Sequence, residues 1–547
     1  MNPLNSPIGY SKSPIQYYSN DINTSDKLNS QGVFSPPTKS LDSLPIEVID
    51  RIFQNTSQLD LLNIIKLNKF FYINYRFKLF TNVIIDSNYN FFNSEQESTS
   101  TIINNAYNFE KFIHVVNNVT EVPKIESLTC ISLPDSLNFF DHELNHQLIE
   151  FFKRLHTLNS LIWLNDNFKL EFLHYLPNKH LVKTLVLNIK FNNYLNELNE
   201  DDELTSSFNF PNLEIFSIKP FTNSAKLFKI INNLLISDNN AEVVSNNLKS
   251  LSLSNPAHSN EFSLQQGNII LTVFKASKLK YLNNLQILSL NDFVVSSEIG
   301  RILKKSVNLS NLTSLQIRGL FEWSEDHDSF LSIIRDDLRN LKHLSLDISP
   351  AYDATYEFLY DLKANLLTLD LVITMERSTP QFELVYKPDD FTWVIKKFKS
   401  LEKLSIELYN GVDVPKQQLV DNAPSSFYKP LKALNLKSLR INSSSNYQAV
   451  SSLIETQPHL EFLDLFGNNA SGAPNLGLGM IHPNVLDEWY KVQHVIIYYS
   501  QFNKNIKYLR INGYLFEVNY LNGNESINPK DDSLKRWFND KVMMRIE

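Results

Sequence analysis

The six residues Leu312-Thr313-Ser314-Leu315-Gln316-Ile317 determine the fold, because their pattern recurs along the chain. Apolar side chains stand at the first, fourth and sixth positions of this unit. The alternation from the fourth position onward is typical of a short β-strand, in which successive side chains point to opposite faces. Clear copies begin at Leu248, Leu285, Leu312, Leu341, Leu366, Leu401, Leu436 and Leu460, and weaker copies begin at Ile125, Leu158, Val182, Leu213 and Val492.

Amphipathic segments separate the units and predict one helix in each repeat. After the unit at Leu312, the residues Phe330, Ile333, Ile334 and Leu338 recur at helical spacing, and Asp328 or Ser329 stands where a cap is needed. Successive clear units begin about 24 to 37 residues apart, which leaves room for one strand and one helix. Such repeats stack into a curved α/β solenoid, or horseshoe, whose parallel strands line the concave face.

Composition and charge exclude several classes of protein. The 547 residues are 43% apolar and 20% charged, as in an ordinary folded domain, and the net charge is -8. Without a dense stripe of Lys and Arg we expect no nucleic-acid partner. Cys130 is the only cysteine, so internal disulfides and multi-cysteine zinc sites are excluded. With no signal core and no apolar run near the roughly 18 residues that span a bilayer, we expect no membrane association and a cytoplasmic or nuclear protein.

The N-terminal part differs from the repeats. Residues 1–40 are rich in Ser, Asn and Pro, and we expect a disordered tail. Residues 41–85 predict a first helix through Phe53 and a second helix capped by Asp60, with a later break that would make three helices. Residues 86–124 would form a linker and the entry to the array, and residues 125–547 would form the repeat domain. The helices carry more large apolar side chains than they can bury among themselves, so part of that surface should be an interface.

Residues 41–85 resemble the F-box motif, and the repeats from about residue 125 to 512 resemble leucine-rich repeats. The F-box resemblance rests on Leu44-Pro45-Ile46-Glu47, Ile49, Ile52-Phe53, Leu59-Asp60-Leu61-Leu62 and Leu67-Asn68-Lys69-Phe70. In F-box/leucine-rich repeat proteins, the F-box binds the Skp adaptor of a Skp–cullin–F-box ubiquitin ligase, and the repeats capture the substrate. This chain departs from the pattern in having Phe70 or Phe71 where Trp is usual, and its repeats lack the frequent cysteines of many such arrays.

The resemblance implies which residues would contact the adaptor. The apolar surface would consist of Leu44, Pro45, Ile49, Ile52, Phe53, Leu61 and Leu67, with Lys69 at its rim. Apolar anchors within a polar edge are what a stable interface requires. The alternative is that this segment is only a helical cap on the first repeat.

The third, fifth and seventh residues of each unit would face a partner. From these positions we select as substrate-contacting candidates Arg318, Arg440, Phe462, Asp464, Phe466 and Tyr498. Aromatic residues most often anchor interfaces, so we expect the main substrate contact in the C-terminal third. The alternative is that these aromatic side chains pack beneath an insertion at residues 467–484.

One stretch has the pattern of a zinc-protease helix. His142-Glu143-Leu144-Asn145-His146 spells H-E-x-x-H, and its two histidines share one helix face. The apolar stripe through Leu144, Leu148 and Phe151 places that face toward solvent, and no third ligand follows at the usual spacing. We therefore expect no catalytic residue, no metal site and no cofactor. A metallohydrolase and adventitious metal binding are the alternatives.

The leading interpretation is a non-catalytic subunit that recognises substrates for a Skp–cullin–F-box ubiquitin ligase. Its partners would be a Skp-type adaptor, through that adaptor a cullin, and a protein substrate. A second interpretation keeps the adaptor contact but omits the cullin, so that the chain is a non-degradative interaction scaffold.

Overall fold

The computed structural model describes residues 44–53, 56–87, 99–119, 124–133, 142–165, 168–169, 171–188, 210–219, 246–254, 274, 281–321, 329–349, 351–376, 387–411, 418–419, 425–442, 447–466, 496–511, 513–521, 524–529 and 533–544. The expected tail of residues 1–40 and the expected insertion at residues 467–484 lie outside these ranges.

The chain divides into two compact units, Met1–Asn55 and Thr56–Glu547. Helix α1 (Ile46–Phe53), a helix that the sequence predicted, belongs to the first unit. Pro45 precedes it, and the backbone N–H groups of Val48 and Ile49 both donate to the Pro45 carbonyl. Pro is favoured at this point because its missing N–H would have no partner within the helix. The predicted 41–85 region is therefore shared between the two units.

Two further helices and one 3-10 turn open the second unit. They are α2 (Gln58–Ile65), α3 (Lys69–Tyr75) and η2 (Arg76–Phe80). The Ser57 hydroxyl caps α2 by accepting from the N–H of Asp60 at 3.1 Å, so the prediction that Asp60 is the cap was wrong. Asn68 caps α3 by accepting from the N–H of Phe71 at 2.9 Å. The interruption before Asn68 produces the three helices that the sequence allowed.

The second unit is a mixed α/β structure built on an 18-stranded, mostly parallel sheet among the described residues. The parallel strands are β1 (Asn82–Asp86), β2 (Thr101–Ile103), β3 (Ser127–Ser132), β4 (Ser160–Trp163), β5 (Thr184–Asn188), β6 (Ile215–Lys219), β7 (Ser250–Ser254), β8 (Ile287–Val295), β9 (Ser314–Phe321), β10 (His343–Ser349), β11 (Thr368–Glu376), β12 (Lys403–Gly411), β14 (Ser438–Asn442), β15 (Phe462–Phe466) and β16 (Tyr508–Ile511). The short strand β13 (Gln418–Leu419) pairs antiparallel with β12.

Equivalent positions of successive units pair across this sheet. Leu344 lies opposite Leu315 on one side and Leu369 on the other, and both neighbours are buried. Because side chains alternate along a strand, the fourth and sixth residues of each unit enter the core together. We call the opposite face, which carries the third, fifth and seventh residues, the inner face.

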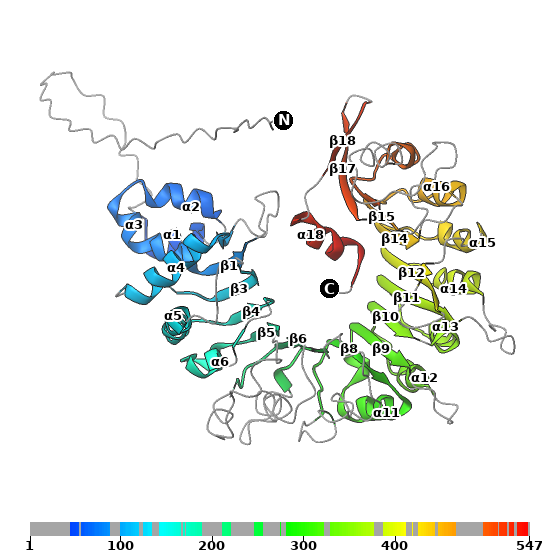
Figure 1. Cartoon of the computed structure of the whole chain (residues 1–547), viewed down its shortest axis with the longest axis horizontal. Helices are drawn as coiled ribbons and strands as arrows, with labels where there is room; N and C mark the ends of the chain where they lie inside the picture. Colours follow the sequence, from blue (N-terminus) through cyan, green and yellow to red (C-terminus); the bar gives the residue numbers. More distant parts are fainter. Residues whose placement is uncertain are drawn as a thin grey trace, which may run out of the picture. The chain divides into compact units, whose positions relative to one another are not determined.

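Helices cover the face of the sheet that lies opposite the inner face (Figure 1). They are α4 (Ala106–Asn118), α5 (His142–Lys153), α6 (Glu171–Tyr175), α11 (Ser297–Ser306), α12 (Phe330–Arg335), α13 (Tyr352–Asp361), α14 (Pro388–Ile395), α15 (Ser425–Tyr428) and α16 (Tyr447–Glu455), with the 3-10 turns η4 (Lys179–Leu181), η5 (Leu309–Asn311) and η6 (Pro430–Ala433). Ser329 caps α12 by accepting from the N–H of Ser332 at 3.1 Å, which confirms one of the two predicted caps.

The structure describes elements near both expected limits of the array. The described part of residues 86–124, expected to be a linker and the entry to the array, includes strand β2 and helix α4, and β1 pairs in parallel with both β2 and β3. Helix α4 buries Phe109, Phe112, Ile113 and Val116. Near the other end, the unit predicted at Val492 does not form a strand at the residues described there, because residues 496–500 are helical and bury Ile496 and Tyr499. The strand is instead β16, preceded by Ile506, with the same spacing as the other units.

The C-terminal end of the sheet is antiparallel. Strands β17 (Tyr514–Leu521) and β18 (Asn524–Pro529) add to β16 as a hairpin. Helix α18 (Ser533–Val542) follows and contacts β12, β14 and β15 (Figure 1). Among the described residues, no helix is both long enough and apolar enough to cross a bilayer.

Candidate interaction surfaces

Helix α1 exposes apolar side chains on the first unit. Ile46, Val48 and Ile52 are each more than 40% exposed, whereas Ile49 and Phe53 are buried. Pro45 is also exposed, and Leu44 is half-buried. The short helix therefore has one face in the interior and one apolar face toward solvent, which is unusual because surface faces are normally polar.

Helices α2 and α3 repeat this arrangement on the second unit. Leu61, Ile65, Phe71 and Tyr75 are buried, and Phe71 and Tyr75 lie with their ring centroids 6.2 Å apart. On the other side, large apolar side chains face solvent, namely Leu59, Leu62, Leu67, Phe70, Tyr72 and Ile73. Leu59 and Leu67 are 69% and 71% exposed, so these two contribute almost nothing to the core of this chain.

Hydrogen bonds fix the start of α2 to the beginning of the sheet. The side-chain amide of Gln58 donates to the carbonyl of Leu79 at 3.2 Å and to the carbonyl of Thr99 at 2.9 Å. The hydroxyl of Thr101 donates to the same Leu79 carbonyl. The exposed apolar side chains of α2 are thus held on a fixed support.

The structure divides the predicted adaptor-contacting residues into two groups. Leu44, Pro45, Ile52, Leu67 and Lys69 reach the surface. Ile49, Phe53 and Leu61 are buried, which corrects their placement on that surface, because they supply the interior side of the same helices. The prediction omitted the other exposed apolar residues of this stretch, namely Ile46, Val48, Leu59, Leu62, Phe70, Tyr72 and Ile73. Helical spacing relative to the buried positions could have identified them.

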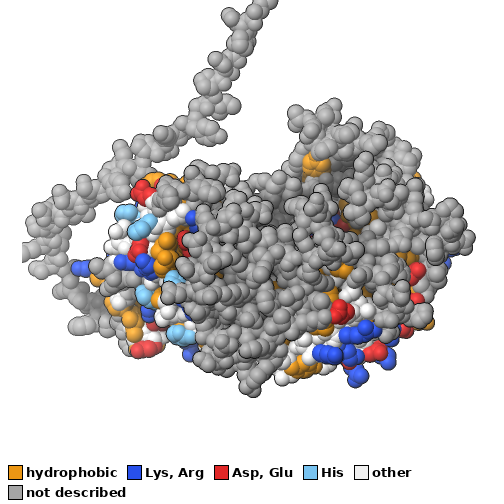
Figure 2. All heavy atoms as spheres, turned by 60° about the horizontal axis from the view of Figure 1, so that its bottom comes forward, with side chains coloured by type: hydrophobic (Ala, Val, Ile, Leu, Met, Phe, Trp, Pro, Cys, Tyr) orange, Lys and Arg blue, Asp and Glu red, His pale blue; other side chains and the backbone are white. Residues whose placement is uncertain are grey.

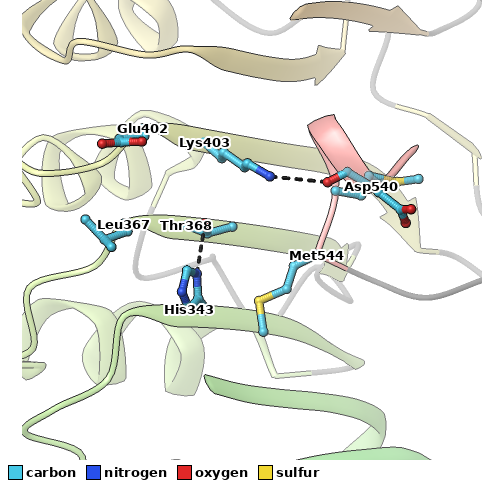
Figure 3. A pocket seen from close by; sticks show the side chains of 8 residues that line it. His343, Leu367, Thr368, Glu402, Lys403, Asp540 and Met544 are labelled. Atoms are coloured by element: carbon cyan, nitrogen blue, oxygen red, sulfur yellow. Dashed lines mark hydrogen bonds between the residues drawn. The ribbon is translucent and has the colours of Figure 1, made fainter. Parts of the chain in front are cut away.

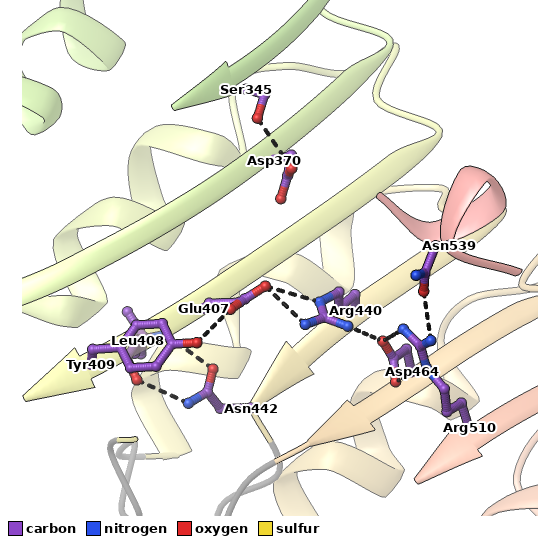
Figure 4. A network of polar contacts seen from close by, with 10 residues as sticks. All are labelled: Ser345, Asp370, Glu407, Leu408, Tyr409, Arg440, Asn442, Asp464, Arg510 and Asn539. Carbon is purple, nitrogen blue, oxygen red and sulfur yellow. Dashed lines mark hydrogen bonds and ion pairs between the residues drawn. The ribbon is translucent and has the colours of Figure 1, made fainter. Parts of the chain in front are cut away.

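A chain of alternating charges crosses the inner face from β12 to β16 (Figure 4). The guanidinium of Arg440 pairs with Glu407 at 2.9 Å and with Asp464 at 2.5 Å. Asp464 also accepts from Arg510 at 2.7 Å and 3.0 Å. The four residues stand on neighbouring strands and are nearly buried, and their charges sum to zero. Arg440 and Asp464, which were predicted to contact the substrate, therefore form an ion pair with each other.

The remaining predicted substrate contacts have separate surroundings. Arg318 is half-exposed and lies 3.2 Å from Asp292 and 3.5 Å from Asp347. The ring of Phe466 lies beneath the guanidinium of Arg440, at 4.5 Å from the ring centroid. Tyr498 does not lie on the inner face as predicted. It belongs to the helical segment 496–500 and packs against Tyr447, while its hydroxyl accepts from that of Ser451 at 3.1 Å.

Helix α18 covers the aromatic end of the inner face. Phe462 stacks on Tyr508 with centroids 5.7 Å apart and lies 5.8 Å from Trp537 and 6.3 Å from Phe538. Phe462 is therefore not free to anchor a partner while α18 is in place. The covering segment is the C-terminal helix, a long-range contact that no local sequence pattern indicated.

A pocket of about 320 Å³ remains beside the end of α18 (Figure 3). Its lining includes His343, Thr368 and Lys403 from the inner face and Asp540 and Met544 from the C-terminal segment. The ammonium of Lys403 donates to the carbonyl of Asp540 at 3.2 Å, and burial lowers the Lys403 pKa. Burial also lowers the pKa of His343, and its Nδ1 lies 3.1 Å from the Thr368 hydroxyl. Both polar side chains and the thioether side chain of Met544 therefore line the pocket.

The outer surface has mixed charge. In Figure 2, Lys and Arg side chains stand beside Asp and Glu side chains on the described part of the visible face. Ion pairs account for several of the cations, including Lys304 with Asp337 at 2.8 Å and Arg335 with Asp361 at 2.7 Å. Exposed pairs of this kind contribute little stability.

The residues considered for metal or thiol chemistry have ordinary surroundings. Helix α5 begins at His142, and its His146 is exposed while Leu144 and Leu148 are buried. Within the described ranges, no three His, Cys, Asp or Glu side chains are grouped so that they could hold a metal. Cys130 is buried in β3, and burial raises its pKa well above the usual range, with Asp86 adding to the effect.

No protein-family model matches the chain, and no curated protein matches it significantly.

Proposed function

We propose that this chain is a substrate-recognition subunit of a Skp–cullin–F-box ubiquitin ligase. In this proposal, residues 41–85 are an F-box that binds the Skp adaptor, and the parallel sheet with its helices is a leucine-rich repeat array that binds the substrate. The chain supplies no chemistry. It raises the effective concentration of the substrate near the ubiquitin carrier that the cullin brings.

The exposed apolar side chains of residues 46–73 are the observation that carries the proposal. Of the 17 large apolar side chains exposed among the described residues, nine lie in this short stretch, namely Ile46, Val48, Ile52, Leu59, Leu62, Leu67, Phe70, Tyr72 and Ile73. The other eight are spread from Tyr107 to Trp393. Three of the nine lie on the first unit and six on the second, and exposed apolar side chains that recur so closely along the sequence are typical of segments that another protein covers.

The repeated strands support the second half of the proposal. Each parallel strand adds its third, fifth and seventh residues to the inner face, so the sheet offers a long continuous surface. Arrays of this type bind partners through such extended faces. The irregular spacing of the units alters which side chains lie together and therefore which partner fits.

Co-purification tests the proposal. The full-length chain should be expressed with a tag while the proteasome is blocked, and the recovered proteins should include a Skp-type adaptor and a cullin in addition to the substrate. Leu59→Asp and Leu67→Asp should remove the adaptor and the cullin, because each places a carboxylate in the proposed apolar contact. Both residues are mostly exposed, so the fold should survive.

Tyr107→Asp is the matched control, because Tyr107 is 71% exposed on α4, outside the proposed F-box. This variant should retain both partners. Recovery of the adaptor without any cullin would favour the non-degradative scaffold. If the adaptor is absent from the wild-type sample, or is retained equally by all three variants, the proposal fails.

A further inference from the structure

The position of α18 is not explained by a need to close the end of the sheet. The hairpin β17–β18 pairs beyond β16 and covers the edge that the last parallel strand would otherwise leave open. Helix α18 instead contacts β12, β14 and β15, on the inner face before the end of the array. It therefore occupies a face rather than an edge.

The apolar contacts of α18 are separate from the main core. Phe538, Val542 and Met543 are buried with Leu515 in a small cluster of their own, distinct from the cluster that runs through the repeats. Half-buried aromatic side chains surround this cluster, and the Trp537 ring lies 4.8 Å from that of Tyr508. Removing α18 would expose this small cluster but would leave the main core closed.

Polar contacts orient α18 on the inner face. The guanidinium of Arg510 donates to the side-chain oxygen of Asn539 at 2.5 Å and lies 4.8 Å from the centroid of the Phe538 ring. Lys403 donates to the carbonyl of Asp540 near the end of the helix (Figure 3). Within its own chain, this face therefore contacts two adjacent aromatic residues, Trp537 and Phe538, followed by an oxygen acceptor on Asn539.

The fit between α18 and the face is incomplete. The hydroxyls of Ser405 on β12 and Ser438 on β14 are buried and have no hydrogen-bond partner among the described residues. A buried hydroxyl without a partner is destabilising. The pocket beside the end of α18 also remains unfilled. A ligand that reached these hydroxyls and the His343, Thr368 and Lys403 side of the pocket would make contacts with the face that α18 leaves unmade.

We propose that the inner face of β12, β14, β15 and β16 binds a short helix, which α18 supplies in cis and a partner protein supplies in trans. The partner's helix would present two adjacent aromatic residues to Phe462 and Tyr508, followed by a carbonyl or carboxylate oxygen for Arg510. Binding of the partner then requires displacement of α18, so α18 limits access to the face. That this partner is the ubiquitination substrate rests on the proposed function, but the presence of a helix-binding face does not.

A labelled peptide of residues 530–547 tests this inference without a known partner. The full-length chain should bind the peptide weakly, because its own α18 competes at high effective concentration. Full-length chain carrying Trp537→Ala and Phe538→Ala should bind the unaltered peptide at least about tenfold more tightly. A peptide with the same two alanines should bind neither protein measurably. The pair Tyr360→Ala and Trp393→Ala, two exposed aromatic residues on α13 and α14, should leave peptide binding unchanged.

Hydrogen exchange measured on the same proteins shows whether the double variant has lost only α18 or has been destabilised throughout the array. Protection of β9, β10 and β11 should be unchanged in the double variant and in Trp537→Ala alone, while α18 loses protection. Equal peptide binding by wild type and a well-folded double variant would overturn the inference, and so would loss of protection throughout β9–β11 in both variants. Adaptor binding, measured in parallel, should be the same for all these proteins. Its absence in the wild type would refute the ubiquitin-ligase role and leave the helix-binding face standing.

Discussion

Asp464 has a different role from the one that its position in the repeat suggested. It occupies a fifth position, which should face a partner, yet only 1% of its surface is exposed. Its two oxygens accept from Arg440 and Arg510, which come from the strands on either side. The sequence shows that Asp464 stands at a fifth position, but it does not show the ion pairs. The three charged residues are more than 20 residues apart and meet only through the register of the sheet.

Removing the Asp464 carboxylate should therefore destabilise the fold. In Asp464→Ala, two buried guanidinium groups lose their shared partner, and we expect the free energy of unfolding to fall by about 3–5 kcal/mol. Urea denaturation followed by circular dichroism measures this change. Glu461→Ala removes a comparable but exposed ion pair with Lys507, at 3.1 Å, and should change stability by no more than about 1 kcal/mol. Equal effects of the two substitutions would mean that the charge chain is not a buried network.

Cys130 should be chemically inert in the folded protein. Burial and the nearby Asp86 raise its pKa, so at pH 8 the reactive thiolate is scarce as well as enclosed. Iodoacetamide should label the native chain very slowly and the urea-unfolded chain rapidly. Lys399→Cys adds an exposed thiol and should give one fast equivalent beside the slow one. Fast labelling of the native wild-type chain would show that β3 opens readily.

At the scale of elements, an asparagine just before many strands connects consecutive repeats. The side-chain amides of Asn284, Asn311 and Asn340 donate to the carbonyls of Asn246, Asn283 and Ser310 at 2.7–2.8 Å. Asn212 and Asn505 make the same contact with His180 and Pro458, both at 2.7 Å. The sequence showed a polar residue before most units, but only the stacked repeats reveal that it satisfies a carbonyl of the preceding one.

Loss of these bonds should weaken the stacking of repeats. Each of Asn284→Ala, Asn311→Ala and Asn340→Ala should reduce the free energy of unfolding by about 1 kcal/mol, and the triple variant by roughly the sum. Asn365 stands at the equivalent place before Leu366, and the structure gives its side chain no such bond among the described residues. Asn365→Ala is therefore the control and should change stability by less than half as much. An equal loss for Asn365→Ala would mean that the effect is one of local propensity.

One irregularity between elements shows why details escape sequence reasoning. The pairing of β8 with β9 shifts between Asn291 and Phe293, and Asp292 there has a positive φ of 59°. Gly319 lies opposite, where a Cβ would come within 2.1 Å of the Phe293 carbonyl oxygen. The sequence shows Gly319, but it does not predict the bulge that requires a glycine there, because the bulge depends on the neighbouring repeat.

At the scale of the whole molecule, the repeated strands were predictable because each unit carries its own local pattern. Every predicted unit except the one at Val492 coincides with a strand. The two ends were not predictable to the same degree. The β-branched residues Ile496 and Ile497 suggested a strand but lie in the helical segment 496–500, since Ile496 and Tyr499 fill the core at helical spacing. The position of α18 depends on contacts with β12, whose sequence lies more than 100 residues away.

The exposed apolar side chains of residues 46–73 show the same limit. Sequence reasoning identified the stretch correctly as too apolar to bury itself, but it assigned Ile49, Phe53 and Leu61 to the outside, and these are inside. The resemblance to the F-box motif indicates which positions would contact an adaptor. Whether a side chain at such a position is buried depends on how its helix packs. The proposed adaptor contact therefore depends more on the exposed Leu59 and Leu67 than on the buried Ile49, Phe53 and Leu61.

The most direct test is the affinity of the purified full-length chain for a purified Skp-type adaptor, measured by calorimetry. We predict saturable one-to-one binding in the micromolar range or tighter. Leu59→Asp or Leu67→Asp should weaken it by at least about 100-fold, as expected for anchor residues, while Tyr107→Asp leaves it unchanged. The absence of saturable binding by the wild-type chain, or equal weakening by all three substitutions, would contradict the account.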